Sequence, residues 1–231
     1  MKRIGMIGGM SWESSLEYYR MINLGVRELL GGLHSAECIM YSVDFAPVEA
    51  LQSSGAWSEA AESMLEAALR VEAAGADFLI ICTNTMHKTA DLVAEHIDIP
   101  LLHIADATAL AVECRGFRTV GLLGTRFTME EDFYKGRLAS CHGLDVLIPD
   151  QKSREELDRV IYEELCRGLT LAESRVFYRD VIATFAERGA EGVILGCTEI
   201  GLLVKQDDSP LPLFDTTAIH ADAAVRYALG R

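Results

Sequence analysis

The cysteines at positions 82 and 197 are the residues best placed, by type and spacing, to do chemistry. Each follows an apolar run and precedes a threonine, as Cys82-Thr83 and Cys197-Thr198, and the two steps lie 115 positions apart. A thiol at the end of a buried strand, repeated half a chain later, predicts two thiols that face one site. One thiolate can remove a proton from a carbon while the opposite thiol returns one to the other face, which is general acid–base chemistry. On an amino acid this chemistry is racemisation without a cofactor.

The residues after each cysteine suggest how a thiol is activated. Thr83-Asn84-Thr85 and Thr198-Glu199 can each begin a helix, whose N-terminal N–H groups would lower the pKa of the cysteine. The same donors could hold a substrate carboxylate. Since the α-proton of an amino acid is a very weak acid, the carbanion also needs a dry, donor-rich site.

Other interpretations of these residues stay open. A buried cysteine at a strand end is often a packing residue, and Cys38, Cys114 and Cys141 have no matched partner that suggests more. His87 could tune the thiol of Cys82, or it could be a solvated helix histidine. Glu199 could cap its own helix or tune the second thiol.

Short apolar runs that lack polar alternation predict strands covered on both faces, as in parallel sheets. Helix-period segments separate these runs, so we expect an α/β fold with right-handed crossovers. The predicted strands are Arg3–Gly9, Glu37–Val43, Asp77–Cys82, Leu101–Ile104, Thr119–Gly124, Asp145–Ile148, Gly192–Gly196 and Leu211–Phe214.

Polar residues mark several expected helix starts. Ser11 is a candidate N-cap for a helix over Trp12–Leu30. Three Ser/Thr-x-x-Glu patterns predict further N-caps at Thr128, Ser153 and Thr170.

An internal repeat predicts two similar halves. The segment Ile4–Gly9 matches Val120–Thr125 at an offset of 116 positions, and the two Cys-Thr steps match at 115. We therefore expect two pseudo-symmetric α/β domains, each with a mostly parallel sheet. Residues 1–105 with 215–231 would form the first, and 106–214 the second. Chance similarity of generic β–α units is the alternative explanation.

Ligands of open α/β sheets bind beyond the carboxyl ends of the strands. Both Cys-Thr steps lie at such ends, as do the loops Gly8–Ser11 and Gly124–Arg126. If the two halves face each other, these four loops converge on one cleft. Gln52 and Gly55-Ala56-Trp57 fall in an expected irregular segment, which is either a lid or a surface loop.

Composition narrows the class of protein. Half of the 231 residues are hydrophobic, and the net charge of −14 without a Lys/Arg cluster argues against a nucleic-acid partner. No apolar stretch approaches the ~20 residues that span a bilayer, and the short N-terminal apolar run is too brief for a signal peptide. We therefore expect a cytoplasmic protein with free thiols. No metal-ligand spacing, G-x-G-x-x-G or P-loop pattern occurs, so no metal or nucleotide site is expected.

The chain resembles the cofactor-independent aspartate/glutamate racemases over nearly its whole length. The carriers are Ile7–Ser14, Tyr41–Phe45, Cys82–His87, Gly121–Thr125 and Gly196–Ile200. The resemblance implies two Rossmann-like α/β domains around a small amino-acid substrate, no cofactor, and a homodimer. It also implies that Cys82 and Cys197 are the catalytic acid/base pair.

The resemblance further implies a set of substrate contacts, which fall at Met10, Ser11, Gln52, Thr83, Asn84, Thr85, Thr125, Cys166 and Thr198. At Cys166, aspartate-specific members often have a lysine, and some have an arginine near Gln52. A charge-assisted contact contributes roughly 1.5–3 kcal/mol to binding. The loss of these cations therefore predicts that the chain belongs to the branch of the family with broad or L-aspartate/L-glutamate activity. Arg167 would replace the lysine only if its helix turned it inward.

Two other functions fit the same residues. A related dicarboxylate isomerase or decarboxylase would replace the proton of one cysteine or would not use it. A non-catalytic ligand sensor would need neither thiol.

Overall fold

The computed structural model describes the whole chain, residues 1–231. The chain divides into two compact units: residues 1–104 with 220–231 form the first, and residues 105–219 form the second. Helix α11 (Thr216–Leu229) begins in the second unit and ends in the first. Each unit contains one parallel sheet flanked by helices, which confirms the predicted α/β class. None of the helices has the length and apolar character needed to span a membrane.

The sheet of the first unit has three parallel strands. Strand β1 (Ile4–Gly8) lies between β2 (Cys38–Ser42) and β3 (Phe78–Ile81). The expected strand at Leu101–Ile104 is wrong, because Leu101 forms only an isolated bridge to Leu79. The chain turns at once into α5 (Ile104–Glu113), which leaves no room for a strand.

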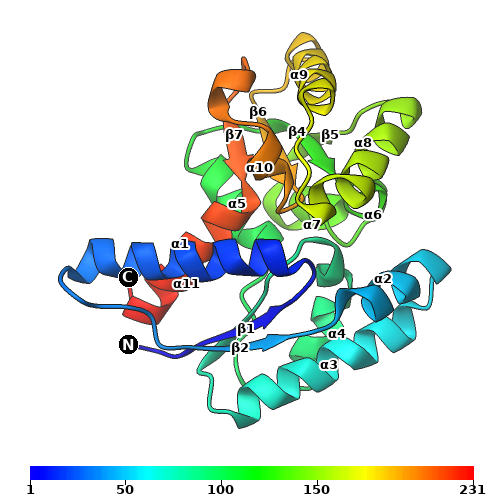
Figure 1. Cartoon of the computed structure of the whole chain (residues 1–231). Helices are drawn as coiled ribbons and strands as arrows, with labels where there is room; N and C mark the ends of the chain where they lie inside the picture. The colour runs from blue at the N-terminus through cyan, green and yellow to red at the C-terminus, as the bar shows by residue number, and fades with distance from the viewer. The chain divides into compact units, whose positions relative to one another are not determined.

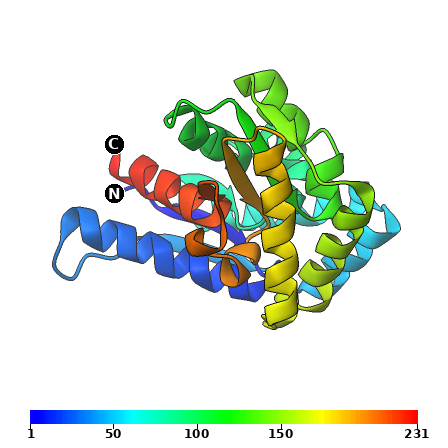
Figure 2. The same ribbon diagram turned by 90° about the horizontal axis from the view of Figure 1, so that it is seen from above.

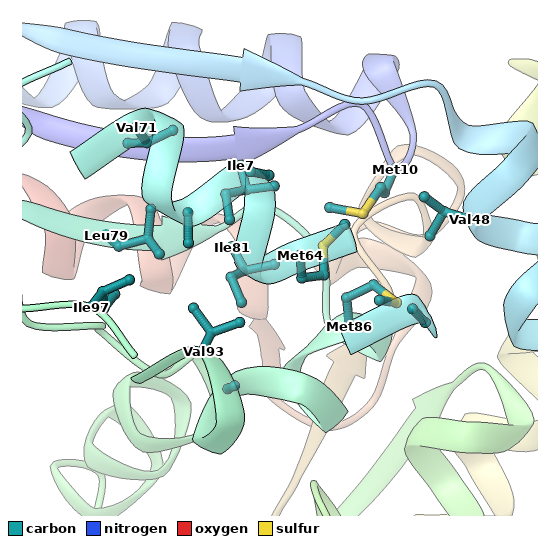
Figure 3. Packing of buried hydrophobic residues seen from close by; sticks show 14 of the residues in the cluster. Ile7, Met10, Val48, Met64, Val71, Leu79, Ile81, Met86, Val93 and Ile97 are labelled. Carbon is teal, nitrogen blue, oxygen red and sulfur yellow. The ribbon is translucent and has the colours of Figure 1, made fainter. Parts of the chain in front are cut away.

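Alternate residues of these strands pack against opposite helical layers. On one face, Ile7, Leu79 and Ile81 join a buried cluster with Met64 and Val93, which Figure 3 shows at close range. The helices of this layer are α2 (Phe45–Ser54), α3 (Trp57–Ala73), the 3-10 helix η1 (Thr85–Thr89) and α4 (Ala90–Glu95).

Helix α1 (Trp12–Leu30) and the end of α11 cover the other face of this sheet (Figures 1 and 2). The bounds of α1 are those predicted, and Ser11 caps it by accepting a hydrogen bond from the N–H of Ser14. Both chain termini belong to this unit, where the N–H of Lys2 donates to the carbonyl of Ala228 at 2.9 Å.

The segment around Gln52 differs from the irregular segment that was expected. Gln52 lies within α2, and Trp57 is the first residue of α3. Only Gly55 and Ala56 separate the two helices, and Gly55 ends α2 with a φ of 75°, a conformation that glycine adopts at little cost.

The second unit has four parallel strands in the order β5-β4-β6-β7. They are β4 (Thr119–Gly124), β5 (Asp145–Leu147), β6 (Gly192–Gly196) and β7 (Leu213–Asp215). Besides α5 and the start of α11, its helices are α6 (Arg126–Glu130), α7 (Lys135–His142), α8 (Gln151–Glu163), η2 (Leu165–Arg167), α9 (Ala172–Glu187), α10 (Ile200–Leu203) and η3 (Gln206–Asp208).

The three predicted capping boxes of this unit are wrong. The caps of α6 and α8 are Thr125 and Asp150, whose side chains accept from the backbone N–H of Thr128 and Ser153. A polar residue three positions earlier therefore provides the cap in both cases. Helix α9 has no side-chain cap at all, so Thr170 does not cap it either.

Gly5 is required by close packing at the centre of the first sheet. A Cβ atom there would lie 2.5 Å from Cγ1 of Val71 and 2.8 Å from the carbonyl oxygen of Phe78. Backbone cannot move aside easily, so we expect Gly5→Ala to lower the free energy of unfolding by about 1–3 kcal/mol in urea denaturation. Gly136→Ala, at the start of α7, is the control and should change it by less than about 1 kcal/mol. Equal effects of the two substitutions would contradict this interpretation.

Candidate active site

Cys82 lies directly after β3, at the carboxyl end of the first sheet. Its N–H donates to the carbonyl of Ile7 at 2.9 Å, and its own carbonyl accepts from the hydroxyl of Ser14 at 3.4 Å. The side chain is fully buried on the α1 face of the sheet. This burial raises the pKa of the Cys82 thiol well above its ordinary value.

The loop that contains Met10 and Ser11 is fixed by hydroxyl groups from the first turn of α1. The hydroxyl of Ser15 accepts from the N–H of Gly9 at 2.7 Å and donates to the carbonyl of Ser11 at 2.9 Å. Gly9 has a φ of 95°, and a Cβ there would lie 2.2 Å from the carbonyl oxygen of Val43. Only glycine fits at this close approach to the backbone of Val43.

The structure brings most predicted site residues of the first unit together. Met10 packs with Val48 in the same buried cluster as Met86 (Figure 3). The side-chain amide of Gln52 contacts the sulfur of Met86 at 3.0 Å. Thr83, Asn84 and Thr85 are also buried, just after Cys82.

His87 is buried, so it is not a solvated helix histidine. Its Nδ1 lies 2.7 Å from the carbonyl of Thr83, and its Nε2 accepts from the N–H of Ile104 at 3.2 Å. A backbone N–H can only donate, so Nε2 carries no proton and Nδ1–H donates to the carbonyl. His87 therefore holds the backbone of the loop after Cys82.

Helix α11 adds a second buried histidine to this layer. His220 lies 2.9 Å from the carbonyl of Leu102 through Nε2, and the hydroxyl of Tyr18 lies 2.9 Å from Nδ1. Burial lowers the pKa of His220 to about 4, so its ring is neutral at pH 7. Its ring centroid lies 5.8 Å from that of His87.

Cys197 occupies the corresponding place in the second unit. Strands β4 and β6 pair in register up to Gly124 and Gly196, so Thr125 and Cys197 leave adjacent strand ends. A Cβ on Gly124 would lie 2.8 Å from the carbonyl oxygen of Gly196. The paired glycines therefore allow the strand ends to approach closely.

A carboxylate contacts the second thiol directly. The Cys197 thiol donates to Oε2 of Glu199 at 3.0 Å, and the hydroxyl of Thr198 donates to the same oxygen at 2.7 Å. Burial first, and then the negative charge of Glu199, raise the pKa of the Cys197 thiol. Of the two roles considered for Glu199, contact with the thiol is observed, whereas its side chain does not cap α10.

The expected activation of the thiols by helix N-termini is wrong. The helix after Cys82 is a 3-10 helix of five residues, and the one after Cys197 has four. Burial outweighs any stabilisation by such short helices, and the pKa of both thiols is raised rather than lowered. Both cysteines are therefore protonated in the resting protein at neutral pH.

Residues 7–224 match the profile of the Asp/Glu/hydantoin racemase family. The chain belongs to this family. Its fold superposes on a candidate Asp/Glu racemase of Yersinia pestis, with 54% identity, a TM-score of 0.92, and coverage of 99% and 100% of the two chains. It also superposes on an aspartate racemase homologue of Pyrococcus horikoshii OT3. That protein is 37% identical, the TM-score is 0.85, and the match covers 99% of this chain and 100% of the other.

The family assignment confirms the resemblance seen in the sequence and identifies the chain as an amino-acid racemase. A curated relative, the broad specificity amino-acid racemase RacX of Bacillus subtilis, is 23% identical over 72% of this chain and 71% of its own length.

Cys166 is the remaining predicted site residue of this racemase. It lies in η2, is partly buried, and contributes to the raised pKa of Cys197 after burial and Glu199. Its neighbour Arg167 is exposed. The groups that act on the second thiol are therefore one carboxylate, that of Glu199, and one further thiol, that of Cys166.

Sequence reasoning missed the hydroxyl groups of Ser14 and Ser15, which fix the Ser11 loop and the backbone of Cys82. Their spacing of three and four from Ser11 was a usable signal, because such residues lie one helical turn away.

We expect the support that His87 gives to the Thr83 carbonyl to affect turnover. His87→Ala leaves that carbonyl and the Ile104 N–H without their partner, so kcat should fall about tenfold or more through misplacement of the loop. His87→Asn keeps a donor for the carbonyl and should recover part of the loss. Measurement of kcat, KM and the free energy of unfolding for both variants tests this.

A purely structural role for His87 predicts another result. Both variants would lose stability, while kcat for each folded molecule would stay at the parental value.

Proposed function

We propose that this protein is a cofactor-independent racemase that interconverts L- and D-aspartate or glutamate, with Cys82 and Cys197 as its acid/base pair. The observation that supports this most is the matched placement of two buried thiols, one at the carboxyl end of β3 beside β1 and the other at the carboxyl end of β6 beside β4. Racemisation by two groups needs one on each face of Cα, and a pair of thiols can serve as those two groups.

The Cys197–Glu199 contact suggests how the first proton leaves. The thiol proton of Cys197 passes to Oε2 of Glu199, which already accepts it in a hydrogen bond at 3.0 Å. The thiolate then removes the Cα proton while the thiol of Cys82 donates a proton to the opposite face. The products are a neutral Cys197, a Cys82 thiolate and a protonated Glu199. Glu199 then releases its proton to solvent and Cys82 takes one up from solvent, which restores the resting state.

The two thiols differ in their surroundings. Cys197 has a carboxylate partner, whereas Cys82 is packed among apolar residues of the α1 face. The equilibrium constant of a racemase is one, so kcat/KM must be equal in the two directions. The difference between the thiols can therefore appear only in kcat and KM separately.

We propose that uncharged side chains contact the substrate carboxylates. In the first unit these are Ser11, Asn84 and Thr85, and in the second Thr125, all of them buried. The hydroxyl of Thr198 already donates to Glu199, so Thr198 would contact the substrate only after that bond is exchanged. The 37%-identical relative that is called an aspartate racemase homologue supports an acidic substrate. Cys166 in place of a cation supports broader specificity than aspartate alone. We also propose that the active form is a homodimer.

The deciding experiment incubates the purified protein with L-aspartate or L-glutamate in deuterium oxide. We expect the opposite enantiomer on chiral chromatography, with one deuterium at Cα and no change in total amino acid. Carbon dioxide release or double-bond migration instead would favour a decarboxylase or isomerase, and binding without any turnover would favour a sensor.

Cys82→Ala and Cys197→Ala are the matched variants for the mechanism. Each should abolish racemisation, because one face of Cα then has no acid or base. Each should also retain Cα exchange with solvent for one enantiomer, and the two variants should retain it for opposite enantiomers. A variant that racemises near the parental rate would remove its cysteine from the mechanism.

The pH dependence of turnover follows from the raised pKa of both thiols. A thiol whose pKa is raised gains its charged form only at higher pH, so the reactive thiolate becomes more abundant as pH increases. We expect kcat/KM to rise through the alkaline range, past the ordinary cysteine value of about 8.5. If kcat/KM instead reached a plateau below about pH 8, the pKa of the reacting thiol would not be raised by its burial.

A further inference from the structure

A buried threonine at the start of α11 has a hydroxyl group that the fold does not use. Thr217 is 2% exposed, and its Oγ1 has no hydrogen-bond partner in the protein. Its backbone N–H is satisfied, because it donates to Oδ1 of Asp215 at 2.9 Å. Buried hydroxyl groups nearly always have a partner, since the loss of their bonds to water is otherwise uncompensated. The exception at Thr217 points to a partner that binds from outside the chain.

Thr217 lies at the same level of the second sheet as Cys197. Strand β7 is the neighbour of β6 (Figure 1), and the last pair of their ladder joins Leu195 to Asp215. Cys197 and Thr217 each come two residues after this pair. Neighbouring strands of a sheet are about 4.8 Å apart. Since ligands of parallel sheets bind beyond the carboxyl ends of the strands, Thr217 belongs to the same edge as the thiol.

Two contacts hold the start of α11 against the segment that carries the second thiol. The hydroxyl of Thr216 donates to the carbonyl of Leu195 at 2.8 Å, which fixes the first residue of the helix to β6. A Cβ atom on Gly201, in α10, would lie 2.7 Å from Oδ2 of Asp215. The segment after the thiol therefore packs directly on the residue that precedes α11, and Thr217 begins a helix that lies against this segment.

The charges at this edge of the sheet favour a cation as the partner. Asp215 lies two residues before Thr217, and the carboxylate of Glu199 accepts from the Cys197 thiol at 3.0 Å. Oδ1 of Asp215 accepts the N–H groups of Thr217 and Ala218, so it occupies donors of α11 that a substrate carboxylate would need. An ammonium group has three N–H donors and no acceptor, so it can donate to a hydroxyl oxygen. It is also attracted by both carboxylates.

We propose that the hydroxyl of Thr217 accepts a hydrogen bond from the α-ammonium group of the substrate. This group is bonded to Cα, the atom from which Cys197 removes a proton in the proposed function. A contact to it beside the thiol would therefore orient Cα toward the sulfur. The inference rests on the proposed function for the role of Cys197 and for the choice of amino acid. A binding measurement tests it apart from turnover.

Isothermal titration calorimetry with L-aspartate and with succinate, the same dicarboxylate without an amino group, tests the contact. Thr217→Val removes the hydroxyl and keeps the shape of the side chain. We expect it to weaken the binding of L-aspartate about tenfold or more and to leave the binding of succinate unchanged. Thr217→Ser keeps the hydroxyl and should bind both ligands like the parent. If Thr217→Val weakened both ligands equally, the hydroxyl would bind a carboxylate and the inference would be wrong.

The stability of the variants without substrate separates binding from a structural role. Because the Thr217 hydroxyl has no partner within the chain, Thr217→Val should keep or raise the free energy of unfolding in urea. Thr216→Val is the matched comparison, since Thr216 is also buried at the start of α11 but its hydroxyl donates to the carbonyl of Leu195. It should be less stable than the parent. A less stable Thr217→Val protein that binds L-aspartate normally would overturn the inference.

Turnover by the parent protein distinguishes failure of this inference from failure of the proposed function. If the parent racemises aspartate and Thr217→Val binds it equally well, the inference alone is wrong. If the parent binds and racemises a different amino acid, the proposed substrate is wrong. The same comparison, with that amino acid and its deaminated analogue, then decides whether Thr217 binds the ammonium group.

Discussion

Backbone pairing between each central strand and its neighbour is the interaction on which both thiols depend. In the first unit the N–H of Cys82 bonds to the carbonyl of Ile7, just beyond the last pair of β1 and β3. In the second unit β4 and β6 remain paired up to Gly196, and Cys197 is the next residue. Since successive residues of a strand point to opposite faces, a slip of one residue would place either thiol in the wrong layer.

The surroundings of the two thiols make it costly in free energy for this racemase to form a thiolate. Burial disfavours a thiolate at both positions, yet burial also removes the water that would quench a carbanion. The second unit reduces the cost by placing the Glu199 carboxylate where it can take the proton of Cys197. The first unit provides no comparable carboxylate in the apolar layer around Cys82, so its thiol is suited to donate first.

The sequence predicted those features that depend on local periodicity or on one strong motif. The helix Trp12–Leu30 and the α/β alternation have clear patterns, and the buried strands are continuous apolar runs. The sequence did not show which of several possible hydrogen-bond partners a residue would take. Thr125, and not the predicted Thr128, caps α6, and the ring of His87 is held by the N–H of Ile104, 17 residues further along the chain. The contact of Glu199 with a thiol depends on rotamer, which no spacing rule gives.

The return of α11 to the first unit has a consequence for synthesis of the chain. Ala221, Ala224, Val225 and Ala228 complete the apolar layer beneath α1, yet they follow the whole of the second unit in the chain. Until this segment is made, α1 alone covers that face of the three-stranded sheet. The second unit, which is continuous from residue 105 to 219, has all its residues earlier. Nascent chains therefore leave the layer that holds Cys82 incomplete until α11 has been synthesised.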